Sequence, residues 1–131
     1  MDVQKIKIIL APVFEKLRDK IAAAYLFGSV SRDETNPASD IDIAVLLYGK
    51  YPDPGDDVRF ALYADCCRVL KRNDVDIVLL NKAKNLFLLD EIVRNGVVVF
   101  EGNAGLREEF ESRTLHDSIE FKQHRLKVMG F

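Results

Sequence analysis

The stretch between residues 22 and 47 constrains the fold most, because two apolar segments flank one polar turn. Residues 22–27 are apolar and include Tyr, Leu and Phe, which predicts a short buried strand. Gly28 follows, and a glycine lets the chain turn sharply and lets a ligand approach the backbone. If a short helix begins near Ser29, its N–H groups and the serine hydroxyl form an anion site.

The second apolar segment begins with a pair of acids. Asp40 and Asp42 open a run of apolar residues that extends to residue 47. Residues two apart on a strand project from one face, so we expect both carboxylates to reach one point. Two carboxylates on one face repel each other, and a shared cation removes this conflict. Magnesium fits the role, because it takes one or two carboxylates and completes its shell with waters and phosphate oxygens.

Each half of this pattern also has a purely structural explanation. The Gly28–Ser29 pair is compatible with an ordinary turn, and the acids at 40 and 42 with an exposed strand start. The two halves occur together, between two hydrophobic strands, and this combination favours the functional interpretation. The pattern therefore predicts a site for a nucleoside triphosphate and its magnesium ions.

A third acid lies in a similar segment further along the chain. Residues 74–80 resemble residues 40–46, since both segments open with two acids separated by one apolar residue. If the two strands are neighbours, Asp76 lies near Asp42 across the sheet. Asp74 is the competing candidate, but it follows Asn73 and is typical of a turn. The alternative for Asp76 is an edge-strand charge that limits aggregation.

Composition narrows the class of protein. A chain of 131 residues predicts a single domain over residues 1–131. The net charge of -2 argues against direct binding of nucleic acid, which usually requires a basic excess. We find no cleavable signal pattern and no bilayer-spanning run, and we expect a cytoplasmic protein. Cys66 and Cys67 are adjacent on a predicted helix, which disfavours a mutual disulfide and indicates small packing thiols.

The remaining patterns predict an α/β (α+β) fold with a small mixed β-sheet of about four strands flanked by helices. The elements expected besides the first two strands are a helix over 2–20 that Pro12 kinks or divides, a helix capped by Asp56 or Asp57, a strand over 75–80, a helix over 85–94, a strand over 97–100 and a C-terminal helix over 105–127. On the last helix we expect Phe110, Leu115 and Phe121 to pack in the core, and the alternative is that they contact a toxin or a second copy of the chain. Tyr48 and Tyr51 either border the mouth of the pocket or pack as a lid.

The strand, the turn and the double acid resemble those of the DNA polymerase β-type nucleotidyltransferases. By length and order of elements, the chain is similar to the minimal nucleotidyltransferase (MNT) antitoxins of HEPN/MNT toxin–antitoxin systems. Asp76 and the ending at residues 107–115 also contribute to this resemblance. The resemblance implies catalytic and metal-binding roles, with two Mg²⁺ ions, for Asp40, Asp42 and Asp76, and ATP-binding roles for Gly28, Ser29 and Arg32.

The resemblance also implies an activity and a partner. The expected reaction is transfer of AMP from ATP to a tyrosine of a partner HEPN ribonuclease toxin, which would silence the toxin. The protein would then be a protein adenylyltransferase and an antitoxin, and it could form homo-oligomers. One alternative is an antitoxin that acts by binding alone, with weak or no catalysis. Another is a small-molecule nucleotidyltransferase of the aminoglycoside-modifying kind, although nothing obvious in the sequence encloses such an acceptor.

The turn departs from the family pattern at two positions. The family often has Gly-Ser-Arg-x-Arg-Gly, whereas this chain has Val30 in place of the first arginine and Asp33 in place of the last glycine. Arg32 matches the second arginine. One cation that would face the triphosphate is therefore absent, while Asp33 and Glu34 add negative charge.

Overall fold

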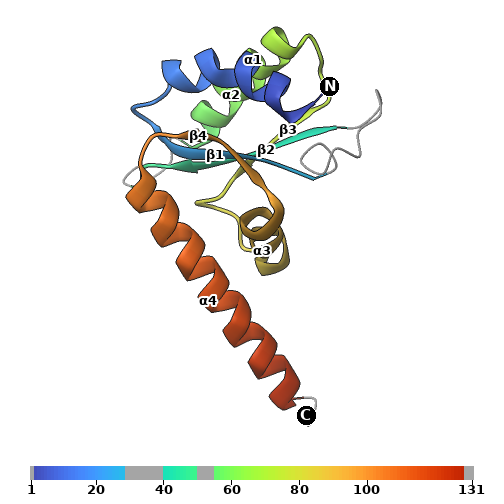
Figure 1. The fold of residues 1–131 in the computed structure, drawn as a ribbon, viewed down its shortest axis with the longest axis vertical. Helices are drawn as coiled ribbons and strands as arrows, with labels where there is room; N and C mark the ends of the chain where they lie inside the picture. Colours follow the sequence, from blue (N-terminus) through green and yellow to red (C-terminus); the bar gives the residue numbers. More distant parts are fainter. Residues whose placement is uncertain (1, 29–39, 50–54, 129–131) are drawn as a thin grey trace.

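The computed structural model describes residues 2–28, 40–49 and 55–128. The elements are α1 (Val3–Lys16), β1 (Ile21–Phe27), β2 (Ile41–Leu47), α2 (Gly55–Leu70), β3 (Val75–Leu79), α3 (Leu86–Asn95), β4 (Val97–Glu101) and α4 (Ala104–Val128). The strands form one mixed sheet flanked by helices (Figure 1). The expected α+β fold class is confirmed.

The order of strands in the sheet is β3-β2-β1-β4. β1 is antiparallel to both β2 and β4, whereas β2 and β3 are parallel. All seven residues of β1 are buried, because helices cover both faces of the sheet at its centre. This explains why the first apolar segment shows no alternation of polar and apolar residues. β3 and β4 form the two edges of the sheet.

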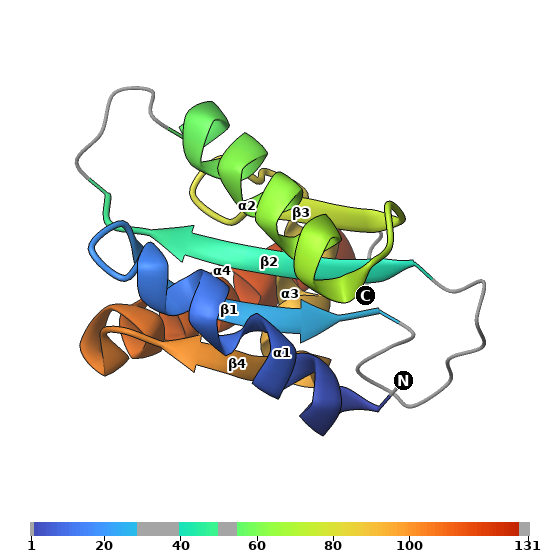
Figure 2. The same cartoon turned by 90° about the horizontal axis from the view of Figure 1, so that it is seen from above.

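Helices lie on both faces of the sheet (Figures 1 and 2). α1 and α2 cover one face, and α3 and α4 lie on the other. Ile41, Ile43 and Val45 of β2 pack on the side of α1 and α2. Because side chains alternate along a strand, Asp42 and Ala44 face the side of α3 and α4. The face that bears Asp42 is therefore fixed by the core packing of its neighbours.

The first two helices differ from expectation at their boundaries. α1 runs through Pro12 as one helix. Pro12 has no N–H to donate to the carbonyl of Ile8, but both residues lie on the exposed side of the helix, and Ile8 is 70% exposed, so water can reach this carbonyl. Asp2 caps α1 by accepting a hydrogen bond from the Lys5 N–H at 2.9 Å. α2 begins at Gly55, ahead of both aspartates that we expected to cap it.

A polar network attaches α4 to the sheet. The hydroxyl of Tyr25, in β1, donates to Glu111 at 2.9 Å. Arg107 donates to both carboxylate oxygens of Glu111, at 3.0 and 2.9 Å, and to Glu101 of β4 at 2.7 Å. Burial and the Glu111 carboxylate raise the pKa of Tyr25 above its usual range. The network therefore joins two strands to the first turns of α4 through one arginine.

The second half of α4 extends beyond the sheet (Figure 1). Phe110 is buried as expected, and Leu115 is half-buried. Phe121 is 43% exposed, and among the described residues its one aromatic contact is an edge-to-face contact with the ring of Phe87. The expectation that Phe121 lies in the core is therefore wrong. The reason is geometric, because a helix of 25 residues is about 37 Å long and outruns a sheet whose strands have seven residues or fewer.

Cys66 and Cys67 are free thiols, in agreement with the sequence. Burial raises the pKa of the Cys66 thiol to about 12, which makes it inert. In the described part of the chain, no helix combines the length and the apolar character needed to cross a membrane.

Candidate active site

Two of the three predicted acids are direct neighbours in the sheet. Asp42 of β2 and Asp76 of β3 are paired in the parallel register. Asp40 lies immediately before β2, two residues from Asp42, and is near enough for its charge to act on the Asp42 carboxyl. Asp42 is half-buried, whereas Asp40 and Asp76 are exposed. The prediction that Asp76 lies beside Asp42 is confirmed.

Electrostatics show how closely these acids interact. Burial raises the pKa of the Asp42 carboxyl, and the negative charges of Asp76 and Asp40 raise it further. The ionised form of Asp42 is therefore less favourable in the folded protein than it would be for an isolated, exposed carboxyl. A divalent cation beside the carboxylate would stabilise it.

Gly28 makes the turn fit against Asp42. Its φ is +75°, in the left-handed region that side chains other than glycine rarely adopt. A Cβ atom at this position would overlap with Oδ2 of Asp42. Phe27, the residue before the turn, pairs with Asp42 across the sheet. The chain therefore needs a glycine here both for its backbone conformation and for the approach of the carboxylate.

The other predicted phosphate-binding residues lie outside the described residues. These are Ser29 and Arg32, together with the departures from the family pattern at Val30 and Asp33. Their roles stay predictions.

Asp74 has a structural partner, as expected for a residue of a turn. Its carboxylate accepts hydrogen bonds from Arg72 Nε at 2.7 Å and from Arg72 Nη2 at 2.5 Å. The bonds to this guanidinium lower the pKa of Asp74. This bidentate ion pair gives the Asp74 carboxylate a charged partner within the protein, so its position needs no bound ligand to explain it. No ion pair of Asp76 is found in the described part of the chain.

Arg72 is a residue near the acids that the sequence analysis did not single out. The hydrogen bonds to Asp74 raise its pKa, and the charge of Asp40 contributes as well. α2 ends at Leu70, and Lys71 adopts a left-handed φ of 55° that turns Arg72 toward the start of β3. Arg72 and Asp74 are two residues apart across a turn, and this spacing is the feature of the sequence from which their ion pair could have been predicted.

The acids offer magnesium a small set of oxygen donors. Within residues 2–28, 40–49 and 55–128, no three carboxylate, imidazole or thiol groups are placed to hold a metal ion. Asp42 and Asp76 nevertheless form an adjacent pair of hard oxygen donors. Magnesium commonly uses one or two carboxylates together with substrate phosphates and waters. The residues present therefore fit a magnesium ion that arrives with a nucleotide better than an ion bound by the protein alone.

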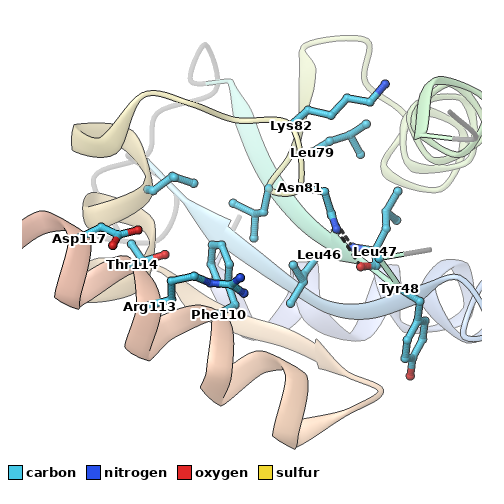
Figure 3. Close-up of a pocket in the computed structure, with 13 residues that line it drawn as sticks. Leu46, Leu47, Tyr48, Leu79, Asn81, Lys82, Phe110, Arg113, Thr114 and Asp117 are labelled. Atoms are coloured by element: carbon cyan, nitrogen blue, oxygen red, sulfur yellow. Dashed lines mark hydrogen bonds between the residues drawn. The ribbon is translucent and has the colours of Figure 1, made fainter. Parts of the chain in front are cut away.

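A large cavity lies away from these acids. It has a volume of about 590 Å³ and lies between α4 and the far ends of β2 and β3 (Figure 3). Tyr48 lines it, and Tyr48 follows Asp42 by six positions, about 20 Å of extended chain. Of the two alternatives for Tyr48, a place at the mouth of the acidic site is therefore excluded, because β2 carries this residue to the opposite end of the sheet. Tyr51 lies outside the described residues.

Solved structures share this fold over nearly the whole chain. A crystal structure of a toxin–antitoxin with AMP-PNP is 25% identical, with a TM-score of 0.75 and coverage of 94% of both chains. A mutant of the toxin–antitoxin MntA–HpeT is 26% identical, with a TM-score of 0.70 and coverage of 98% of this chain and 96% of that chain. The toxin–antitoxin MntA–HepT is 24% identical, with a TM-score of 0.69 and coverage of 96% of this chain and 95% of that chain. At this level of identity, it supports the fold alone.

These structures confirm the resemblance to the minimal nucleotidyltransferase antitoxins. Among curated proteins, no sequence matches this chain significantly. The family model described as "Polymerase beta, Nucleotidyltransferase" matches residues 5–104, a range that includes Gly28 and all three acids. The chain therefore belongs to the polymerase β-type nucleotidyltransferase family.

Proposed function

We propose that this protein transfers AMP from ATP, with magnesium, to a tyrosine hydroxyl of a partner HEPN-type toxin and thereby acts as its antitoxin. The observation that carries the proposal is the contact between Gly28 and Asp42, with Asp76 beside it. Similar chains occur in toxin–antitoxin structures, and one of these contains AMP-PNP. We further propose that residues 1–131 act as one domain, in the cytoplasm.

The acids and the turn have separate tasks in this proposal. Asp40, Asp42 and Asp76 hold two magnesium ions together with the phosphate oxygens of ATP. Gly28 leaves the backbone open to the triphosphate, and Ser29 and Arg32 bind its terminal phosphates. Bound magnesium stabilises the negative charge on the attacking and leaving oxygens of an in-line displacement.

The reaction is a single displacement at the α-phosphorus. The acceptor hydroxyl oxygen forms a bond to this phosphorus, and the bond to the oxygen that bridges the α- and β-phosphates breaks. Pyrophosphate leaves with that electron pair. The hydroxyl proton passes to the carboxylate of Asp76, which is exposed and can release it to water.

The electrostatics of the site favour catalysis over neutralisation by binding alone. A protein that only covers its partner gains nothing from a half-buried carboxylate beside two like charges, because this arrangement costs stability. The left-handed glycine that makes room for this carboxylate is a second feature of the same kind. When a nucleotide and its cations bind there, the carboxylate binds a cation and the glycine turn lets the phosphates approach.

The proposal is tested by incubating the protein with ATP labelled at the α-phosphate, Mg²⁺ and its HEPN-type toxin partner. The unaltered protein should label the toxin, and Asp42→Asn should abolish the labelling. Asp19→Asn is the matched control, because Asp19 is an exposed aspartate in the turn before β1. Full neutralisation of the toxin by Asp42→Asn would support binding alone, and transfer to an aminoglycoside without a protein acceptor would support a small-molecule enzyme.

A further inference from the structure

β3 is the outermost strand of the sheet on the side of the acids (Figure 2). It pairs with β2 on its inner side. An edge strand exposes a row of backbone N–H and C=O groups that can pair with another chain. Asp76, the acid that we propose receives the hydroxyl proton, lies on this strand.

The backbone hydrogen bonds show which groups point outward. Ile41 N–H donates to the Asp74 carbonyl at 3.0 Å, and Leu80 N–H donates to the Val45 carbonyl at 2.9 Å. Asp74 and Leu80 thus both direct backbone groups toward β2. Because backbone direction alternates along a strand, the residues at 76 and 78 do the same. The outward N–H groups are therefore those of residues 75, 77 and 79.

Two hollows follow this outer edge and meet at Asp76. One, of about 240 Å³, is lined by Asp76 and Ile77 and by side chains of α2 that include Arg59 and Phe60. The other, of about 300 Å³, runs from Asp76 along β3 to Lys82 and also includes Arg59. Phe60 is 64% exposed at this edge. The edge is therefore hollowed, bordered by two cationic residues and flanked by an aromatic ring.

We propose that an extended segment of the acceptor protein adds as a further strand along the outer edge of β3 and so places its hydroxyl beside Asp76. This inference rests on the proposed function. A residue paired with Asp76 would have its Cβ about 5 Å away and would project from the same face. That face also bears Asp42. Backbone pairing would thus position the tyrosine, and the cations would favour acidic residues near it.

The first test is residue-resolved hydrogen exchange of the full chain, alone and bound to the toxin. Mg²⁺ and α,β-methylene-ATP are present in both samples, because this analogue blocks the proposed cleavage. The amides of residues 75, 77 and 79 should exchange at least about tenfold more slowly in the complex. The amides of Asp76 and Val78 are the internal control, since their bonds to β2 protect them in both samples.

A charge reversal supplies a second readout that does not depend on protection. Arg59→Glu should raise the KM for the toxin about tenfold, because it places an acid beside an acidic segment. The affinity for Mg²⁺ and α,β-methylene-ATP should stay unchanged. Arg18→Glu, at an exposed arginine in the turn after α1, should change neither quantity.

Other results would overturn the docking mode. Normal labelling of the toxin with fast exchange at residues 75, 77 and 79 would show that the acceptor docks elsewhere. Protection of these amides without toxin, increasing with protein concentration, would show that a second copy of this chain covers the edge. A failure of the unaltered protein to label the toxin would count against the proposed function instead, and exchange in the complex would still decide how the toxin docks.

Discussion

Replacing Gly28 by alanine tests the contact between the turn and the acidic site. The backbone at Gly28 has a φ of +75°, and an added Cβ would overlap with Oδ2 of Asp42. The alanine variant therefore has two separate costs. One is the left-handed backbone, and the other is the displacement of the Asp42 carboxylate.

Both costs have known magnitudes. A left-handed conformation costs a residue other than glycine about 1–2 kcal/mol. Forcing the Asp42 side chain away from its rotamer adds about 1 kcal/mol. We therefore expect Gly28→Ala to lower the free energy of unfolding by about 2–3 kcal/mol, and to abolish AMP transfer because the carboxylate moves.

A double-mutant cycle separates the two costs. In the Asp42→Ala background, the carboxylate is gone, so Gly28→Ala should cost only the backbone part of about 1–2 kcal/mol. Urea denaturation of the four proteins measures these free energies. Gly49→Ala is the control, because an added Cβ at Gly49 meets nothing within 4 Å. Equal costs of Gly28→Ala in both backgrounds would refute the proposed contact.

Three further predictions concern the acids and the network that holds α4. Asp42→Asn should raise the free energy of unfolding without metal at pH 7, by less than about 1 kcal/mol because the partial exposure of Asp42 screens the repulsion, as measured in urea. The pKa of Asp42 is raised in the folded protein, so its protonated form stabilises the fold below the unfolded pKa, and this contribution is lost as pH rises through the folded pKa. The stability that Asp42→Asn adds at pH 7 should therefore disappear in acid. Arg107→Ala should cost about 1–3 kcal/mol, since it removes the ion pairs of both Glu101 and Glu111. Arg68→Ala, at an exposed pair, should cost less than about 0.5 kcal/mol in the same assay. Asp76→Asn should abolish labelling of the toxin, while Asp74→Asn should retain more than half of it.

The local pattern of the acids was sufficient to predict their positions. Alternation along a strand placed Asp40 and Asp42 on one face, and the similarity of residues 74–80 to residues 40–46 placed Asp76 beside Asp42. The core contacts of Ile41 and Ile43 confirm this alternation. These features were predictable because they depend on a two-residue period that the backbone imposes.

Other features depend on contacts between distant parts of the chain. Tyr48 lies in the segment after β2, and only the direction of β2 in the sheet decides that it lines the far cavity. Phe121 belongs to an apolar pattern on α4, but the sheet ends before it can bury this side chain. The guanidinium of Arg72 meets Asp74 because Lys71 turns the chain with a positive φ. None of these outcomes follows from periodicity alone.

The most direct test of the account is anomalous diffraction from crystals grown with Mn²⁺, as a substitute for Mg²⁺, and α,β-methylene-ATP. The account predicts an anomalous peak about 2.0–2.3 Å from carboxylate oxygens of both Asp42 and Asp76, with the α-phosphate of the nucleotide bound to the same ion. A nucleotide bound with its metal elsewhere, or a metal that contacts neither carboxylate, would contradict it.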